Sequence, residues 1–213
     1  ILYPVRKMHE AGIKEICVIT GAEHLGAVVD LLGSGSQYGV DLTYRVQDRP
    51  GGIAQAIGLA ESFVGLDHCT VILGDNLFDA SLVEAVKKYS ECSHNVMPPA
   101  TVFVKEVPDP ERFGVVEYDE GGFPVTLIEN PKAAPSSDAV IGAYMSPSDV
   151  FDRIRNLEPS ARGELEVTDL NNTYLKEGKL IAHKIEGFWV DAGTFETLKL
   201  ANEWGWNLIS EIP

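Results

Sequence analysis

The chain has 213 residues, of which 32 are acidic and 17 basic, so its net charge at pH 7 is −15. Such a charge repels phosphate backbones and anionic lipid, which argues against nucleic acids and membrane surfaces as partners. With 45% hydrophobic and 23% charged residues, the composition is that of a folded globular chain and excludes wholesale disorder. The sequence holds no apolar stretch near the ~18 residues that a membrane span needs.

Helix and strand patterns alternate along the first half of the chain. They predict a helix over 4–11, a strand over 15–20, a helix over 23–32, a strand over 42–46, a helix over 53–63, a strand over 70–73 and a helix over 81–92. Ser81 is the expected N-cap of the last of these helices, with Glu84 three residues later. Repeated units of this kind are typical of a parallel sheet covered by helices.

The second half changes character and contains a hairpin signal around residues 119–122. The pattern predicts strands over 101–104, 115–118, 124–128 and 139–145, helices over 147–156 and 168–177, a strand over 179–185 and a helix over 194–206. Together the two halves predict an α/β fold with three layers and a mixed, mainly parallel sheet. Because no linker divides the sequence, we expect a single domain over residues 1–213.

Cysteine and histidine usage disfavours several chemistries. Three cysteines do not make a disulfide framework in a chain of this size, and Cys17 and Cys69 lie in apolar runs where a buried small side chain is expected. A reducing cytoplasm fits this usage best. The five histidines are scattered and pair with no nucleophile motif, which argues against a hydrolase.

Two glycine-rich segments are interpreted as turns. The segment 21–26 lacks the Lys and Ser or Thr that a phosphate-binding P-loop requires at its end. The segment 33–39 follows a helix rather than a strand, unlike a dinucleotide-binding fingerprint. A dinucleotide-dependent oxidoreductase is therefore disfavoured.

Two carboxylates follow apolar segments at positions where α/β sheets usually bind ligands. Asp75 ends a buried strand in Gly74-Asp75-Asn76, and Asp191 follows Trp189 and Val190. If the sheet brings the two together, only a cation would make the pair favourable, and a hard cation that bridges phosphates needs such ligands. A strand-ending turn at Asp75 and a helix-capping role for Asp191 remain open alternatives.

Two further segments carry polar groups suited to small ligands. Residues 47–55 are expected to form a glycine turn before a helix. In one interpretation its backbone amides approach a nucleotide and Gln47 contacts the edge of the base; in the other the segment is only a turn. Residues 162–169 place acids at alternate positions, which suits bidentate contacts with sugar hydroxyls. A capping cluster around Thr168 explains the same pattern equally well.

Taken in order, these segments resemble the sugar nucleotidyltransferases, most closely those that transfer a thymidylyl group to glucose 1-phosphate. The resemblance extends over nearly all of the chain and is carried by residues 1–4, 41–44, 52–56, 73–76, 109–116, 162–169 and 189–194. It implies a Rossmann-like nucleotidyltransferase domain that joins a nucleoside triphosphate, dTTP, to a sugar 1-phosphate, glucose 1-phosphate, and releases pyrophosphate. It also implies a homo-oligomer.

The resemblance assigns roles residue by residue. Asp75 and Asp191 match the family's magnesium ligands and are the expected catalytic residues. Gln47 and Gly52 match positions at the base and ribose of the nucleotide. The positions expected around the sugar phosphate are Gly114, Glu129, Val140, Glu164 and Trp189.

The sequence departs from the family pattern in three places. Phe113 stands where the family usually has Tyr, and Asn130 stands where it has a Lys that neutralises phosphate. We expect Lys132 to compensate, because two residues along an extended segment return to the same face. The family's glycine-rich N-terminal loop is not found in the sequence, so we expect the chain to be N-terminally incomplete.

These departures keep a second functional hypothesis open. A chain without the phosphate loop and without a Lys at Asn130 could be a non-catalytic subunit that binds a nucleotide or a sugar phosphate. The two hypotheses differ in whether pyrophosphate is released when both substrates are present.

Overall fold

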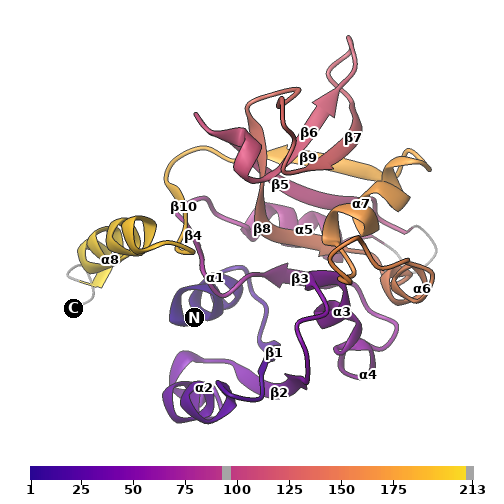
Figure 1. Cartoon of the computed structure of the whole chain (residues 1–213). Coiled ribbons are helices and arrows are strands. Elements are labelled where there is room, and N and C mark those ends of the chain that lie inside the picture. The colour runs from indigo at the N-terminus through magenta and orange to yellow at the C-terminus, as the bar shows by residue number, and fades with distance from the viewer. Residues whose placement is uncertain (93–96, 210–213) are drawn as a thin grey trace.

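The computed structural model describes residues 1–92 and 97–209, which form an α/β fold (Figure 1). The strands are β1 (Glu15–Gly21), β2 (Asp41–Gln47), β3 (Cys69–Ile72), β4 (Asn76–Phe78), β5 (Ala100–Glu106), β6 (Gly114–Tyr118), β7 (Pro124–Glu129), β8 (Asp138–Ser146), β9 (Leu180–Lys184) and β10 (Trp189–Asp191). The helices are α1 (Leu2–Glu10), α2 (Leu25–Leu32), α3 (Ile53–Gly58), α4 (Glu61–Val64), α5 (Val83–Ser90), α6 (Val150–Arg155), α7 (Val167–Leu175) and α8 (Phe195–Ile209), with 3-10 turns η1 (Ser36–Tyr38) and η2 (Pro110–Arg112). Among these helices, none has the length and apolar character needed to cross a bilayer.

The main sheet has six strands, in the order β7-β6-β8-β5-β9, with β3 on β8. The α/β class and the mixed sheet agree with the expectation, but antiparallel pairs outnumber parallel ones in the described residues. Among the described strands, only β1–β2 and β5–β9 run parallel, while β3–β8, β5–β8, β6–β7, β6–β8 and β4–β10 are antiparallel. The reason is the hairpin half of the sequence: β7 returns beside β6, and β8 then runs between β6 and β5.

Helices cover both faces of this sheet, as the three-layer expectation requires. Along β5 the side chains alternate: Val102 and Val104 are fully buried against α3, α6 and α7, which gather at one side of the sheet in Figure 1. Phe103, between them, is buried in a second cluster with Tyr89 of α5. This period of two is what a strand buried on both faces requires.

The parallel pair β1–β2 is separate from the main sheet in the described residues. A cavity of about 1020 Å³, here called the large cavity, is lined by Cys17 and Ile19 of β1 on one side and by Val71 and Ile72 of β3 on the other. All four residues of β3 are only half-buried for this reason. The three cysteines are free, and Cys17 and Cys69, which were expected to be buried, remain partly exposed.

Two local expectations are corrected by the structure. The helix expected over 53–63 is divided into α3 and α4, because the Leu59 amide contacts the carbonyls of both Gln55 (3.3 Å) and Ala56 (3.0 Å) and tightens the turn. The helix expected from Ser81 begins at Val83 with Leu82 as its N-cap residue, although Ser81 Oγ does accept from the Val83 amide at 3.3 Å. The strand-ending turn considered at Asp75 is present, and the short strands β4 and β10, which pair with each other, were not expected.

Candidate active site

The two short strands β4 and β10 place the predicted carboxylates side by side. They pair antiparallel, with Asp191 opposite Asn76, and the Ala192 amide donates to the Asp75 carbonyl at 2.9 Å. The expected proximity of Asp75 and Asp191 is therefore present in the structure. Neither residue caps a helix, since Asp75 precedes β4 and Asp191 ends β10.

The carboxylate pair carries uncompensated negative charge. Burial, followed by the charge of Asp75, raises the pKa of Asp191, and the Gly193 amide and Arg112 only partly oppose this. Oδ1 of Asp191 accepts from the Gly193 amide at 2.8 Å, and Oδ1 of Asp75 accepts from Asn76 Nδ2 at 3.0 Å. Within the described ranges, Oδ2 of each carboxylate accepts no hydrogen bond.

This donor set fits a divalent cation with oxygen preference. Two carboxylates in one place, each with an oxygen available, supply the ligands that Mg²⁺ usually takes from a protein, while water and phosphate oxygens complete its shell. No group of three or more His, Cys, Asp or Glu side chains suited to a metal occurs in residues 1–92 and 97–205. A cation held here would therefore keep open positions for substrate.

A second cavity, here called the small cavity, lies against this pair and has a volume of about 180 Å³. It collects four of the five residues expected around a sugar phosphate. Its lining includes Gly114, Glu129, Val140, Trp189, Asp191, Asn76, Arg112, Phe113 and Thr168.

The fifth expected residue, Glu164, lines the large cavity together with Gln47 and Gly52. Glu129 lines both cavities, so it marks the place where they adjoin. All nine sequence-predicted site residues except Asp75 thus line one of two adjoining cavities, and Asp75 borders the small one through Asn76.

Trp189 presents its ring, rather than its N–H group, to the small cavity. Its Nε1 donates to Oδ1 of Asn76 at 2.8 Å, so this donor is already used within the protein. The ring packs edge-on against Phe113, with centroids 5.2 Å apart. An apolar contact with the face of a sugar is what this arrangement offers.

The glycine turn and the acidic segment, which the sequence presents separately, are joined in the structure. Gly52 has φ +93°, and a Cβ there would lie 2.3 Å from the Leu165 carbonyl oxygen. The Leu165 amide donates to the Gly51 carbonyl at 2.8 Å. Gln47 Nε2 donates to the Gly52 carbonyl (3.2 Å) and to Gln55 Oε1, which orders the turn from within.

The capping alternative for residues 162–169 is not what the structure shows. Glu166 is the N-cap residue of α7 and makes no side-chain capping bond. Its carboxylate instead accepts from Ser160 Oγ (2.7 Å) and pairs with Arg162 at 2.9 Å. Thr168 directs its hydroxyl to Glu129, at 2.6 Å.

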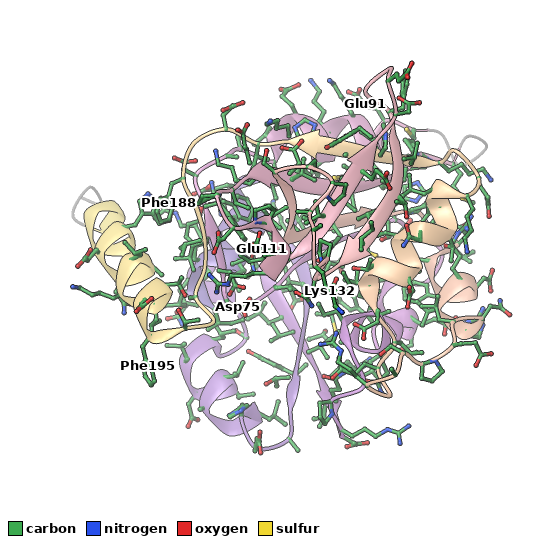
Figure 2. The ribbon with its side chains drawn as sticks, turned by 45° about the horizontal axis from the view of Figure 1, so that its top comes forward. Asp75, Glu91, Glu111, Lys132, Phe188 and Phe195 are labelled. Carbon is green, nitrogen blue, oxygen red and sulfur yellow. The ribbon has the colours of Figure 1, made fainter. Side chains whose placement is uncertain are left out.

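Asn130 occupies a backbone position that suits it. Its φ is +44°, which makes it the one non-glycine residue with positive φ in the described part of the chain. Asn tolerates this left-handed conformation better than most residues. The backbone N–H of Asn130 donates to the Phe113 carbonyl at 3.0 Å. Lys132 is exposed, lies in the central part of Figure 2, and lines neither cavity.

The sequence alone assigned no role to Asn76 or Arg112, and for Thr168 it offered only helix capping. The one sequence feature that pointed to Asn76 was its position, because it is a polar residue directly after the acid that follows a strand. Thr168 and Arg112 lie in segments that carried the family resemblance, but their partners are distant in sequence and appear only in the fold.

Comparison with known proteins identifies the family. A model of the nucleotidyl transferase family matches residues 1–204. The low-salt glycan biosynthesis nucleotidyltransferase of Haloferax volcanii is 41% identical over 202 residues, which are 94% of this chain and 56% of that protein. The glucose-1-phosphate thymidylyltransferase of Neisseria meningitidis serogroup A is 41% identical over 201 residues, 93% of this chain and 68% of that protein.

A solved structure agrees with these relatives. The chain superposes with a TM-score of 0.88 and 48% identity on a Bacillus anthracis crystal structure assigned to a glucose-1-phosphate thymidylyltransferase and containing sucrose, covering 96% of this chain and 81% of that one. The expected resemblance and the Rossmann-like fold are confirmed, and the enzymatic interpretation is favoured over a non-catalytic subunit. The chain spans about half to two thirds of the length of the curated relatives it matches. It belongs to the nucleotidyl transferase family.

Proposed function

We propose that this chain catalyses transfer of a nucleotidyl group from dTTP to glucose 1-phosphate, giving dTDP-glucose and pyrophosphate, with Mg²⁺ held by Asp75 and Asp191. The observation that carries the proposal is the position of the carboxylate pair: β4 and β10 set it at the border of a cavity lined by Gly114, Glu129 and Trp189. The names of the relatives from Neisseria and Bacillus support the choice of base and sugar.

The reaction needs alignment and charge neutralisation more than proton transfer. A phosphate oxygen of the sugar 1-phosphate attacks the α-phosphorus, the new P–O bond forms, and the bond to pyrophosphate breaks, with pyrophosphate taking the electron pair. The attacking oxygen is already anionic, so no general base is required. Mg²⁺ at the carboxylate pair would neutralise phosphate charge during this displacement.

The chain's own residues orient the two substrates. Glu129 and Glu164 accept hydrogen bonds from sugar hydroxyls, and the Trp189 ring packs against the sugar. The ordered turn of Gln47 and Gly52 faces the large cavity, where it contacts the base and ribose. A protein with net charge −15 also needs local cations, and Arg112 and Arg162 line the two cavities.

We further infer a cytoplasmic enzyme that works as an assembly of identical subunits. The free cysteines support a reducing compartment.

Three exposed apolar side chains on α8 support an interface with a second copy of the chain. Phe195 is 93% exposed and projects at the periphery of Figure 2, and Leu198 and Leu200 lie on the same helix. Analytical ultracentrifugation tests this, since a monomer at micromolar concentration would contradict it.

A substrate panel tests the proposed activity. Each nucleoside triphosphate is paired with several sugar 1-phosphates, and pyrophosphate is measured with and without Mg²⁺. We expect the fastest release with dTTP and glucose 1-phosphate, and none after chelation of the metal. Binding of both ligands without pyrophosphate release would favour the non-catalytic hypothesis.

A further inference from the structure

Asn76 lies at the centre of the candidate site, and its buried side-chain amide is hydrogen-bonded through both its oxygen and its nitrogen. The residue is 3% exposed. Its Oδ1 accepts from the Gly142 amide at 3.0 Å and from Trp189 Nε1 at 2.8 Å, while its Nδ2 donates to Asp75 Oδ1 at 3.0 Å. Because both groups at Oδ1 are N–H donors, the amide has one possible orientation, and its NH₂ group must point toward Asp75.

The main chain of β8 leaves space for this amide. A Cβ at Gly142 would lie 2.5 Å from Asn76 Nδ2, 2.8 Å from Asn76 Cγ and 2.8 Å from Leu73 Cδ1. The φ of Gly142 is not in the left-handed region, so an alanine there would meet no backbone strain. Glycine at 142 therefore leaves room for two side chains, the Asn76 amide in closest contact and the end of Leu73.

We propose that Asn76 is a positioning residue that orients the Asp75 carboxylate for its cation and ties it to Trp189 at the small cavity. The proposal rests on the proposed function, because it takes Asp75 as a ligand of the divalent cation. Asn76 occupies Oδ1 of Asp75 and leaves Oδ2 for the cation. The same side-chain amide accepts a hydrogen bond from the Trp189 indole. Asn76 therefore connects the carboxylate that would hold the cation to the aromatic ring that lines the small cavity.

Residue chemistry explains why an amide is suited to this position. An Asp here would turn an acceptor toward Asp75 and add a third negative charge beside Asp191. An Ala would leave the Trp189 and Gly142 N–H groups without their acceptor in a buried place. Only a neutral side chain with an acceptor and a donor on one planar group satisfies all three contacts.

The test separates positioning from loss of structure by using two substitutions that act on one contact. N76A removes the amide, whereas G142A keeps Asn76 and pushes it from its place. In the double variant N76A/G142A the added methyl group no longer meets the Asn76 amide, and only the end of the flexible Leu73 side chain, 2.8 Å from the added Cβ, has to move. G26A is the matched glycine control, since Gly26 of α2 has nothing within 4 Å of an added Cβ and no positive φ.

The first readout is binding of Mn²⁺ alone, followed by electron paramagnetic resonance of the free ion. We expect N76A and G142A each to weaken binding by about 10-fold or more, as for other residues that orient metal ligands. G142A should add little in the N76A background, because the two changes remove the same contact. G26A should bind Mn²⁺ like the parent chain.

The second readout divides kcat from KM in the pyrophosphate assay. We expect N76A and G142A to lower kcat and to raise the Mg²⁺ concentration needed for half-maximal rate. If N76A does not fold, the test uses W189F instead, which keeps an aromatic ring but loses the N–H that donates to Asn76. We expect W189F to weaken Mn²⁺ binding by about 3- to 10-fold.

Unchanged Mn²⁺ binding in folded N76A, or in W189F, would overturn the proposal. So would independent, additive losses from N76A and G142A. A parent chain that binds Mn²⁺ with the expected variant pattern, yet releases no pyrophosphate with any substrate pair, would contradict the proposed function and leave the positioning role standing.

Discussion

Thr168 Oγ1 donates a 2.6 Å hydrogen bond to Oε2 of Glu129 in the wall of the small cavity. Thr168 lies in the first turn of α7 and is 6% exposed, while Glu129 is the last residue of β7. The other carboxylate oxygen, Oε1, accepts from Asn130 Nδ2 at 3.2 Å. The helix thus fixes the direction in which Glu129 presents its carboxylate to a sugar.

Removing this hydroxyl should therefore weaken sugar binding. We expect Thr168→Val to raise the KM for glucose 1-phosphate by about 3- to 10-fold, the range of one hydrogen bond to a charged group that is partly replaced by water. Thr168→Ser keeps the hydroxyl and is the control, with a KM close to that of the parent. Steady-state kinetics at saturating dTTP measures both, and equal KM values for the Val and Ser variants would contradict the assignment.

The repulsion between Asp75 and Asp191 should be visible as instability without metal. Burial and the charge of Asp75 raise the pKa of Asp191, so its ionised form is disfavoured in the folded state. This destabilisation is present at pH 7 and disappears as the pH falls through the raised pKa.

We expect Asp191→Asn, in the presence of a chelator at pH 7, to raise the Tm by no more than about 3 °C, because solvent screens a half-buried pair. Added Mg²⁺ should then stabilise the parent more than the variant. Thermal unfolding with and without Mg²⁺ checks both statements. A variant that is less stable than the parent in chelator would show that the carboxylate pair is not strained.

The positive charge at the small cavity should come from Arg112. It is the one cationic side chain lining that cavity in the described part of the chain, and only its Nη1 is engaged there, with Asp109 Oδ2 at 2.8 Å. We expect Arg112→Gln to raise the KM for glucose 1-phosphate by about 10-fold or more, since contacts between charged groups and phosphate are among the stronger ones.

Two controls make the Arg112 result specific. Arg155→Gln removes an exposed arginine that pairs with Glu61 and Asp152 and lines neither cavity. Lys132→Gln tests the competing expectation that Lys132 replaces the family's lysine. A large KM effect in Lys132→Gln, with none in Arg112→Gln, would return that role to Lys132.

Glu177 should make the stability of the chain depend on acid pH. Hydrogen bonds from Arg153, at 2.8 and 2.9 Å, and from Lys179 lower its pKa from 4.5 to about 2. A carboxylate with a lowered pKa stabilises the fold above its unfolded pKa, and the effect is lost as the pH falls through the folded one.

Glu177→Gln should accordingly be less stable than the parent at pH 7, with a difference that shrinks between pH 4.5 and about 2. Urea unfolding at pH 7, 5 and 3 measures the difference. Glu84→Gln, at an exposed position in the first turn of α5, is the control. A difference of equal size at pH 7 and pH 3 would exclude this source of stability.

The longer elements and the proximity of Asp75 and Asp191 were predictable from the sequence because each has a local signal. Strands β1 and β5 contain apolar runs, β2 alternates apolar and polar residues, and an acid after a buried strand indicates a ligand-binding edge. Strands β4 and β10 were missed because three residues containing Asp or Asn do not show alternation. Their pairing depends on a partner more than a hundred residues away.

Side-chain direction inside the site could not be predicted for the same reason. The Trp189 indole N–H donates to Asn76 from a distant part of the chain, and Thr168 binds Glu129 instead of capping its own helix. The excess of antiparallel pairs also follows from a long-range fact, the position of β8 between β6 and β5. The hydrophobic periodicity of a segment indicates which of its side chains are buried, but it does not indicate which other segments they pack against.

Pyrophosphate release from dTTP and glucose 1-phosphate, compared between the parent chain, Asp75→Asn and Asp30→Asn, tests the central claim most directly. Asp30 is an exposed acid on α2 that lines neither cavity, so it controls for loss of one negative charge. The account predicts Mg²⁺-dependent release by the parent and by Asp30→Asn, and a rate lower by about 100-fold or more for Asp75→Asn. An Asp75→Asn variant as active as the parent would contradict it.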